Sequence, residues 1–394
     1  MRSARRPTSR LPACRCGWSR AKYRSGTTGG TDQREARLDT LTHALTGVLA
    51  ARALASVPVS RGLEAPSGPG LAACMGVGFF AAVFPDIDGA LALLSPTAYL
   101  LGHRGLTHSL LLLPVWAALL AWLFSSFGRR RECLKPFFVI SAAALAVHVA
   151  GDVITSFGTL LLSPLSDRRF ALSSVFIIDL WFSGIALAGV VGSLLLPRWR
   201  LPAVAALAAL CGYVAFSSLQ HDRAIEVGLA RAAANGWPDA TVSAMPRPVS
   251  PFNWMVTVEN GERYEVAQVN LRRAEPLVAG EDAGFLRRLD AAYRPVELAT
   301  WVTATRFGID EDAREIAQAV WDQPGFETMR WFYALPALYA IQRASGEQCA
   351  WFQDLRFAVP GRASVPFRYG MCRASPSAPW QRFEMVGEDG RRPF

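Results

Sequence analysis

The chain has 394 residues, 51% of them hydrophobic, and a formal net charge of +9. Its mean hydropathy of +0.20 is unusual for a soluble protein of this length and favours a membrane protein. Residues 1–37 hold ten Lys or Arg and two Asp or Glu, so they carry +8 of the charge. The remaining chain is close to neutral, which excludes a generally basic nucleic-acid-binding body, and we expect no nucleic acid partner.

The first segment, residues 1–37, is rich in Gly, Ser, Thr and Arg. It has no apolar core of the kind that a secretory signal requires. We expect either a disordered basic tail or a start-site artefact, with the natural chain beginning at Leu38.

Six apolar segments follow, separated by Pro, Gly or charged residues. Four can cross a hydrocarbon core of about 30 Å: Leu106–Phe124, Phe137–Leu162, Phe176–Leu196 and Leu201–Leu219. The two shorter segments, Leu41–Ala55 and Leu71–Phe84, suit tilted or re-entrant helices. We therefore predict a polytopic α-helical membrane domain over residues 38–220.

Residues 221–394 have the pattern of a smaller α+β domain outside the membrane. Asn260-Gly261 lies between alternating apolar flanks and predicts a β-hairpin. Further elements are expected as two helices and two strands: Glu311–Val320, Met329–Arg343, Asp354–Val359 and Arg368–Arg373. Cys349 and Cys372 form a disulfide if this domain faces an oxidising compartment.

The most informative pattern concerns histidine. The chain has five histidines, and four of them lie near acidic residues in or beside the apolar segments. The fifth, His221, is expected to be an interfacial residue. The candidate metal ligands are Asp39, His43, Asp86, Asp88, His103, His108, His148, Asp152 and Asp179.

These groups are predicted to meet at one membrane face. Successive spans alternate in direction, and each group falls at the end of its span that this alternation brings to the same side. An Asp in the bilayer core costs about 2.5–3.5 kcal/mol and needs a partner. A bound cation offsets that cost for several carboxylates at once.

Imidazole and carboxylate ligands together favour Zn²⁺, Mn²⁺ or Fe²⁺ over Ca²⁺. One ion, or two adjacent ions of the kind used in phosphoester cleavage, would fit such a set. Asp88, His108 and Asp152 are the candidate catalytic residues, without a separate assignment of the general base. Arg104 and Thr107 are candidates for supporting the ligands or binding a substrate anion.

Four motifs occur in a characteristic order: Asp-x-x-Thr-His (39–43), Pro-Asp-Ile-Asp (85–88), His-Arg-x-x-Thr-His-Ser (103–109) and His-x-x-x-Asp-x-x-Thr-Ser-Phe-Gly (148–158). In these motifs, residues 38–220 resemble the YdjM-like inner-membrane metal-dependent hydrolases, a family also described as LexA-binding. The resemblance implies a polytopic protein of the bacterial inner membrane with metal-dependent hydrolytic activity, and it fixes no substrate. Leu38 stands where the family motif usually has Met.

Basic residues in short loops predict the orientation. Seven lie on the face opposite the cluster and three on the cluster face. The seven are Arg61, Arg129, Arg130, Arg131, Lys135, Arg198 and Arg200, and the three are Arg104, Arg168 and Arg169. The metal site and residues 221–394 are therefore expected on the extracytoplasmic side, with membrane lipid as a partner.

Three functions remain open. The first is a hydrolase that acts through metal-activated water on a phosphoester or lipid-linked substrate. The second is a non-catalytic protein whose metal staples the helices and whose C-terminal domain binds a partner. The third, an ion transporter, is disfavoured because the half of each span away from the cluster is almost purely apolar.

Overall fold

The structure is a computed structural model, and it describes residues 31–55, 69–128, 131–280, 282–344, 346–362, 365–387 and 390–394. Residues 1–30 of the basic segment lie outside this part, as do Arg61, Arg129 and Arg130 of the orientation argument. The first helix is already formed at Thr31, ahead of the expected start at Leu38.

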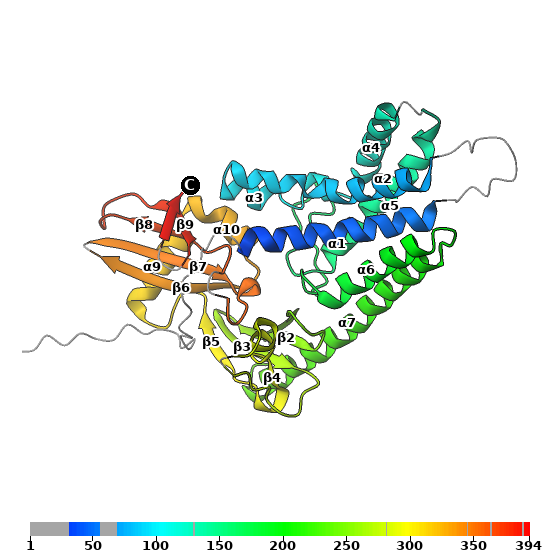
Figure 1. The fold of residues 1–394 in the computed structure, drawn as a ribbon. Coiled ribbons are helices and arrows are strands. Elements are labelled where there is room, and N and C mark those ends of the chain that lie inside the picture. Colours follow the sequence, from blue (N-terminus) through cyan, green and yellow to red (C-terminus); the bar gives the residue numbers. More distant parts are fainter. Residues whose placement is uncertain are drawn as a thin grey trace, which may run out of the picture.

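The N-terminal part is helical (Figure 1). Its α-helices are α1 (Thr31–Leu54), α2 (Leu71–Val83), α3 (Pro96–Gly102), α4 (Leu113–Phe127), α5 (Leu134–Val153), α6 (Leu180–Leu195) and α7 (Leu201–Ala234). Short 3₁₀ helices join them: η1 (Phe84–Leu93), η2 (Leu106–His108) and η3 (Arg131–Cys133).

Within the described residues, three helical stretches are long and apolar enough to cross a membrane: Leu71–Leu93, Arg131–Val153 and Leu201–Ala234. A fourth span results if α3–η2 and α4 count as one segment, although they are bent by 75°. Helix α6 is apolar but shorter than these. The expected membrane domain is thus present, with different boundaries for its spans.

Two of these differences have local causes. Leu106–Phe124 was expected to be one straight span, but Leu110 donates a backbone hydrogen bond to Leu161 and the Ser109 hydroxyl donates to the carbonyl of Ser163. These bonds hold the break between η2 and α4 against a loop. The expected span Phe176–Leu196 begins later, because Asp179 caps the N-terminus of α6.

Helices α1 and α2 cross at very short range because both carry glycine at the crossing. A Cβ built on Gly78 would lie 2.5 Å from the Gly47 carbonyl oxygen and 2.5 Å from the Ala51 Cβ. Small residues at a crossing let membrane helices approach through backbone contact. At the far ends of the helices, the buried Arg52 side chain donates to the carbonyls of Pro197 and Trp199 in the α6–α7 loop.

The C-terminal part contains two five-stranded sheets, mainly antiparallel, which confirms the α+β prediction. The first comprises β1 (Thr241–Pro246), β2 (Asn253–Asn260), β3 (Arg263–Asn270), β4 (Arg294–Pro295) and β5 (Val302–Thr305). The second comprises β6 (Pro336–Ala344), β7 (Glu347–Asp354), β8 (Tyr369–Arg373), β9 (Gln381–Val386) and β10 (Gly390–Pro393). The helices are α8 (Phe285–Asp290), α9 (Glu311–Trp321) and α10 (Glu327–Phe332), with 3₁₀ turns η4 (Val296–Leu298), η5 (Pro324–Phe326) and η6 (Leu355–Phe357).

The Asn260-Gly261 hairpin is confirmed as the β2–β3 turn, and Cys349 and Cys372 form a disulfide across β7 and β8. The helix predicted over Met329–Arg343 is wrong: α10 ends at Phe332, and β6 begins at Pro336 and pairs with β7. Pro336 cannot donate a helical hydrogen bond and favours extended backbone before it.

The strand predicted over Asp354–Val359 is also wrong. The Asp354 carboxylate accepts a hydrogen bond from the Arg356 backbone nitrogen, which ends β7 and starts a 3₁₀ turn.

The C-terminal part docks on the helical part through α3 and the loop after α5. Leu100 and Phe157 are members of the same buried cluster as Phe326 and Phe332. Arg356 donates to the backbone carbonyls of Ser156 and Phe157. Figure 1 shows α3 beside α10 at this junction. The junction lies at the end of the helical part where the His/Asp groups gather.

Candidate metal centre

Eight of the nine predicted ligands meet at one end of the helical part. They come from the middle of α1, from η1, from the α3–η2 turn and η2, and from the last turns of α5. The eight are Asp39, His43, Asp86, Asp88, His103, His108, His148 and Asp152, and each lies within 4.0 Å of another member. The convergence of distant segments at one end, inferred from alternating spans, is therefore present in the structure.

The imidazoles of His108 and His148 face each other with their Nε2 atoms 3.0 Å apart. His148 Nδ1 lies 2.6 Å from the Ala82 carbonyl oxygen, which only accepts hydrogen bonds, so Nδ1 carries the proton. His108 Nδ1 lies 3.1 Å from a carboxylate oxygen of Asp88, so it too is the donor. When both rings are neutral, their Nε2 atoms present lone pairs to the same point, an arrangement typical of metal-binding histidines whose second nitrogen is fixed by an acceptor.

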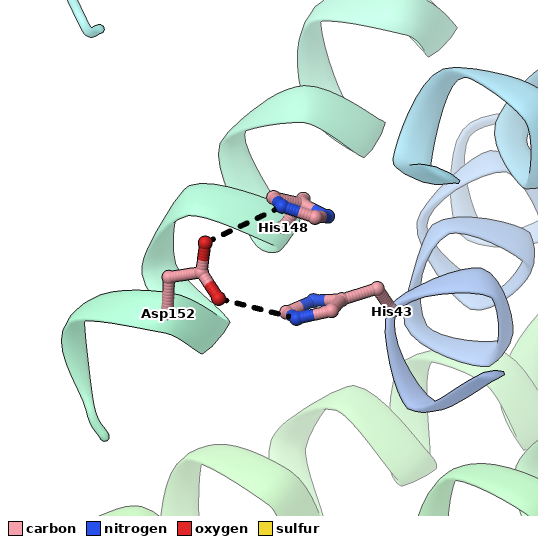
Figure 2. A group of neighbouring side chains, drawn as sticks. All are labelled: His43, His148 and Asp152. Carbon is pink, nitrogen blue, oxygen red and sulfur yellow. Dashed lines mark ion pairs between the residues drawn. The ribbon is translucent and has the colours of Figure 1, made fainter. Parts of the chain in front are cut away.

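Asp152 lies at the centre of the cluster, with a side chain that is 0% exposed. Its Oδ2 is 2.9 Å from His108 Nε2 and 3.4 Å from His148 Nε2. Its Oδ1 is 3.3 Å from His43 Nε2. Figure 2 shows the carboxylate between His148, on its own helix α5, and His43 on α1. Asp152 thus contacts two sides of the cluster with different oxygens.

Asp86 completes the group around the paired imidazoles. Its Oδ1 lies 3.6 Å from His148 Nε2 and 4.0 Å from His108 Nε2. The Asp86 side chain is 19% exposed, whereas those of His108, His148 and Asp152 are 0% exposed. Asp86, His108 and His148 form one set whose ligand atoms lie within 4.8 Å of one another, and His43, His148 and Asp152 form a second, overlapping set.

His43 depends on a glycine in the neighbouring helix. Its ring lies against that of His148, with centroids 3.9 Å apart and the ring planes tilted by 32°. A Cβ on Gly151 would lie 2.9 Å from His43 Cε1, closer than such contacts allow. Glycine at position 151 therefore permits α1 to bring His43 against α5.

Asp88 lies on the Nδ1 side of His108, and both of its carboxylate oxygens are engaged by other groups as well. It accepts hydrogen bonds from the Arg104 backbone nitrogen at 3.0 Å and from the Thr107 hydroxyl at 2.7 Å. His103 Nδ1 is 2.7 Å away. These contacts suit a residue that orients His108, so the geometry moves Asp88 and His103 from the predicted ligand set to its support.

Arg104 is the one guanidinium inside the described part of the cluster, and it is 2% exposed. Its NH2 lies 2.9 Å from Asp152 Oδ1 and 3.4 Å from Asp39 Oδ2. Its backbone is in the left-handed region, with φ 57°, which costs a non-glycine residue roughly 1–3 kcal/mol. This conformation points the backbone nitrogen at Asp88 and the side chain at Asp152.

Asp179 is the predicted ligand that the structure does not bring into contact with the other eight. Its Oδ1 accepts from the backbone nitrogens of Trp181 and Phe182, and its Oδ2 accepts from the Tyr213 hydroxyl. Both oxygens serve the cap of α6 and Tyr213, so Asp179 stands apart from the other eight residues in this geometry. His221 pairs with the neighbouring Asp222.

Several supporting residues were not predicted. Tyr99 stacks on His103 with centroids 4.5 Å apart, and Phe157 lies under the Arg104 guanidinium at 5.0 Å. The hydroxyls of Thr40 and Thr155 bind Asp86 and Arg104. Thr40 and Thr155 fall inside the quoted motifs, which was the available signal, whereas Tyr99 falls outside them.

The charge of the cluster tests whether a cation fits. Four carboxylates and one guanidinium give a formal charge of −3 when the imidazoles are neutral. His43 Nε2 and both carboxylate oxygens of Asp152 are buried without a hydrogen bond of good geometry among the described residues. Buried charges require pairing or a metal, so the donor set fits a divalent cation.

Comparison with known proteins gives a partial match. A protein of Bacillus subtilis (strain 168), "Uncharacterized protein YfhP", is 29% identical over 91 residues, which are 23% of this chain and 28% of that protein. The chain thus spans little more than a quarter of that relative. No solved structure matches the chain.

The family comparison covers the segment that carries the cluster. Residues 38–224 match the family described as the YdjM inner membrane protein. This range contains α1 from residue 38 onward, all of α2–α6 and the first two-thirds of α7. The range also contains all four motifs on which the resemblance was based. The membrane part of this chain, residues 38–224, is thus similar to the YdjM inner membrane protein family.

Proposed function

We propose that the protein is a membrane-bound, metal-dependent hydrolase. Asp86, His108, His148 and Asp152 hold one divalent ion, with Zn²⁺ or Mn²⁺ matching the mixed imidazole and carboxylate ligands. The observation that carries the proposal is the pair of imidazole Nε2 atoms 3.0 Å apart beside the carboxylates of Asp152 and Asp86. Without a cation or an added proton between them, these atoms repel one another.

When bound, the metal would lower the pKa of a coordinated water and supply hydroxide near neutral pH. The protein's own residues prepare the site for this reaction. Asp88 and the Ala82 carbonyl fix the two imidazole rings. Asp86 and Asp39, 19% and 16% exposed, lie at the edge from which water and substrate reach the cluster.

The second cation of a two-metal site is replaced, in this proposal, by Arg104. The position beside Asp39, His43 and Asp152 Oδ1 resembles a second metal site in its donors. The Arg104 guanidinium already lies 2.9 Å from that Asp152 oxygen. A second divalent ion there would be strongly repelled, since two cations a few ångströms apart interact by several kcal/mol at a partly buried site. We therefore expect one metal ion per chain.

The substrate class follows from the position of the cluster at the end of apolar helices. A site at a bilayer surface is suited to a phosphoester or another lipid-linked group, whose polar part reaches the ion while its chain stays in the membrane. The Cys349–Cys372 disulfide supports an extracytoplasmic C-terminal domain and metal site, because disulfides persist in oxidising compartments.

The main alternative is a metal that staples the helices and has no catalytic role. A structural site is coordinatively closed, whereas a catalytic site keeps an open position. The partial exposure of Asp86 favours the catalytic proposal. The transporter hypothesis has no such support.

The test uses purified full-length protein in detergent, loaded with Zn²⁺ or Mn²⁺. Elemental analysis should find one equivalent of metal in the wild type and in Arg104→Lys, and less than a tenth of this in His108→Ala. Phosphodiester and lipid phosphate-ester substrates should be hydrolysed by the loaded wild type alone. Bound metal without hydrolysis of any substrate would favour the staple, and a wild type that binds no metal would refute both.

A further inference from the structure

A cavity of about 610 Å³ lies apart from the metal centre, where α6 and α7 meet the first sheet. It is lined by aromatic residues of both helices and by polar and basic residues of the loops next to β2 and β3. These residues are Trp181, Tyr213, Phe216, Ser250, Pro251, Phe252, Asn270, Arg272 and Arg273. None of the eight cluster residues lines it. Figure 1 shows this region where α7 approaches β2.

The helical wall of the cavity has the composition of a membrane–water interface. Trp181 opens α6, and Tyr213 and Phe216 lie on α7, near the end of its apolar stretch. Trp and Tyr concentrate at the headgroup level of a bilayer. Leu180 precedes Trp181 and Leu219 lies one turn beyond Phe216; they are 50% and 61% exposed and enlarge the apolar surface of this wall. A ligand in the cavity can therefore keep an acyl chain along these helices.

The opposite wall holds two adjacent arginines in fixed positions. The Asn270 side-chain oxygen accepts from the backbone nitrogens of both Arg272 and Arg273. Arg273 then forms an ion pair with Asp290 and donates to two backbone carbonyls. Its charge is neutralised within the protein, so it serves to shape the wall.

Arg272 is different. Its guanidinium lies over the Phe252 ring at 5.5 Å, and Phe252 packs edge-to-face on Phe216 of α7 at 5.8 Å. Among the described residues, the guanidinium nitrogens of Arg272 have no hydrogen-bond acceptor. The aromatic contacts hold a cation at the rim of the cavity with its donors available to a ligand.

The ligand's charge follows from these pairs. Asp290 balances Arg273, and Asp179, which binds the Tyr213 hydroxyl, lies at the positive N-terminus of α6. Arg272 is left as one uncompensated positive charge beside an apolar wall. This matches one negative charge on an acyl-bearing molecule.

We propose that this cavity binds the phosphodiester headgroup of a monoanionic membrane lipid, with Arg272 contacting the phosphate. The guanidinium offers paired donors that match phosphate oxygens. The aromatic wall and the exposed leucines contact the glycerol and the first part of the acyl chains. The site is independent of the proposed hydrolysis and requires no metal.

The test is native mass spectrometry of the full-length protein released from detergent, titrated with phosphatidylglycerol or phosphatidylcholine of identical chains. The wild type should retain phosphatidylglycerol preferentially. Arg272→Ala should weaken this retention on the order of tenfold, the effect of losing one charge-assisted hydrogen bond of about 1.5 kcal/mol. The matched control is Arg288→Ala, which removes the same charge from an exposed arginine outside the cavity.

Three outcomes would overturn the proposal. One is equal retention of the two lipids by the wild type. Another is an equal loss in Arg272→Ala and Arg288→Ala, which would indicate a general surface charge effect. The third is competition by soluble glycerophosphoglycerol at the same concentration as the lipid, which would indicate a free phosphodiester as the ligand. Because Arg272 is exposed, its replacement by alanine should not destabilise the fold. An unchanged melting temperature would establish that the Arg272→Ala variant is folded.

Discussion

Asp152 shows how one buried side chain can depend on four segments of a chain. Its two oxygens contact His43 from α1, Arg104 from the α3–η2 turn, His108 from η2 and His148 from its own helix. A carboxylate with no exposure survives in such a place only if cations compensate it. Arg104 supplies one positive charge, and the proposed metal ion supplies further positive charge beside the other carboxylate oxygen.

Asp152→Asn is therefore expected to remove most of the bound metal and to destabilise the protein. The amide keeps the size of the side chain but leaves Arg104 without its closest carboxylate. Breaking a buried ion pair costs about 3–5 kcal/mol. Elemental analysis and thermal unfolding in detergent measure the two effects.

The control is Asp179→Asn, a change of the same kind in a carboxylate that caps α6. Asn is also a good N-cap residue, so metal content and stability should stay near wild type. Equal metal loss in both variants would mean that Asp179 is a ligand after all and that the present geometry of the cluster is incomplete.

At the scale of helices, the metal centre depends on how closely α1 and α2 approach. Their crossing has backbone contacts at Gly47 and Gly78, which no larger residue permits. The same two helices deliver His43 and, through η1, Asp86. A change in the distance between α1 and α2 at the crossing is therefore expected to shift the positions of the ligands.

Gly78→Ala should lower both the melting temperature and the metal affinity, because its Cβ would meet the Gly47 carbonyl oxygen at 2.5 Å. Overpacking of this kind typically costs about 1–3 kcal/mol. Gly76→Ala on the same helix has no neighbour within 4 Å and should be neutral. Equal behaviour of the two variants would contradict the proposed coupling between crossing and site.

Much of the helical part could be predicted because hydropathy and alternating direction act over whole segments. The positions of His103 on a turn and of His148 with Asp152 on one helix face followed from spacing alone. The sequence could not reveal the contacts of Asp88, since His103 binds one of its oxygens and Arg104 and Thr107 bind the other, and only the folded α3–η2 turn assembles these groups. Asp179 could not be set apart from the other eight for a similar reason: nothing in the spacing distinguishes a helix cap from a ligand.

The errors in the C-terminal domain arose from tertiary pairing. The segment from Pro336 has enough apolar residues for a helix, yet its backbone pairs with β7, so the partner strand decides its conformation. Pro336 and Asp354 were the available signals for the ends of these elements. Both act through the backbone, which an apolar pattern does not reveal.

At the scale of the whole molecule, Arg169 joins the two parts. It donates to the carbonyls of Gly158 and Leu100, and its guanidinium lies over the Trp331 ring at 4.7 Å. Burial, together with the nearby charge of Arg356, lowers the pKa of Arg169 to about 9. The contacts with Trp331 and Phe332 of α10 offset part of that cost only while the C-terminal domain is docked.

Arg169→Gln should therefore loosen the junction without removing metal. Hydrogen exchange in residues 155–170 and in α10 should become faster, since α10 loses the cation that contacts Trp331 and Phe332. The neighbouring Arg168→Gln changes an exposed side chain over Phe170 and should leave the exchange unaltered. Unchanged exchange in both variants would exclude a docking role for Arg169.

The orientation of the whole molecule can be tested at Ser377, an exposed position of the C-terminal domain. Ser377→Cys should react with a membrane-impermeant maleimide in intact spheroplasts if this domain is extracytoplasmic. The wild type supplies the background labelling, to which Cys211, the exposed free cysteine of the described residues, can contribute. Labelling only after the membrane is permeabilised would reverse the proposed orientation.

The bridging position of Asp152 also bears on how the protein is made. The ribosome delivers His43 and Asp86 well before α5, where His43 contacts Asp152 and Asp86 contacts His148. A charged residue gains nothing by entering hydrocarbon ahead of its partner, so the nascent α1 and α2 are expected to wait at the lipid surface until α5 emerges. Integration of this bundle into the bilayer would then be a late and collective event, paced by translation of residues 134–153.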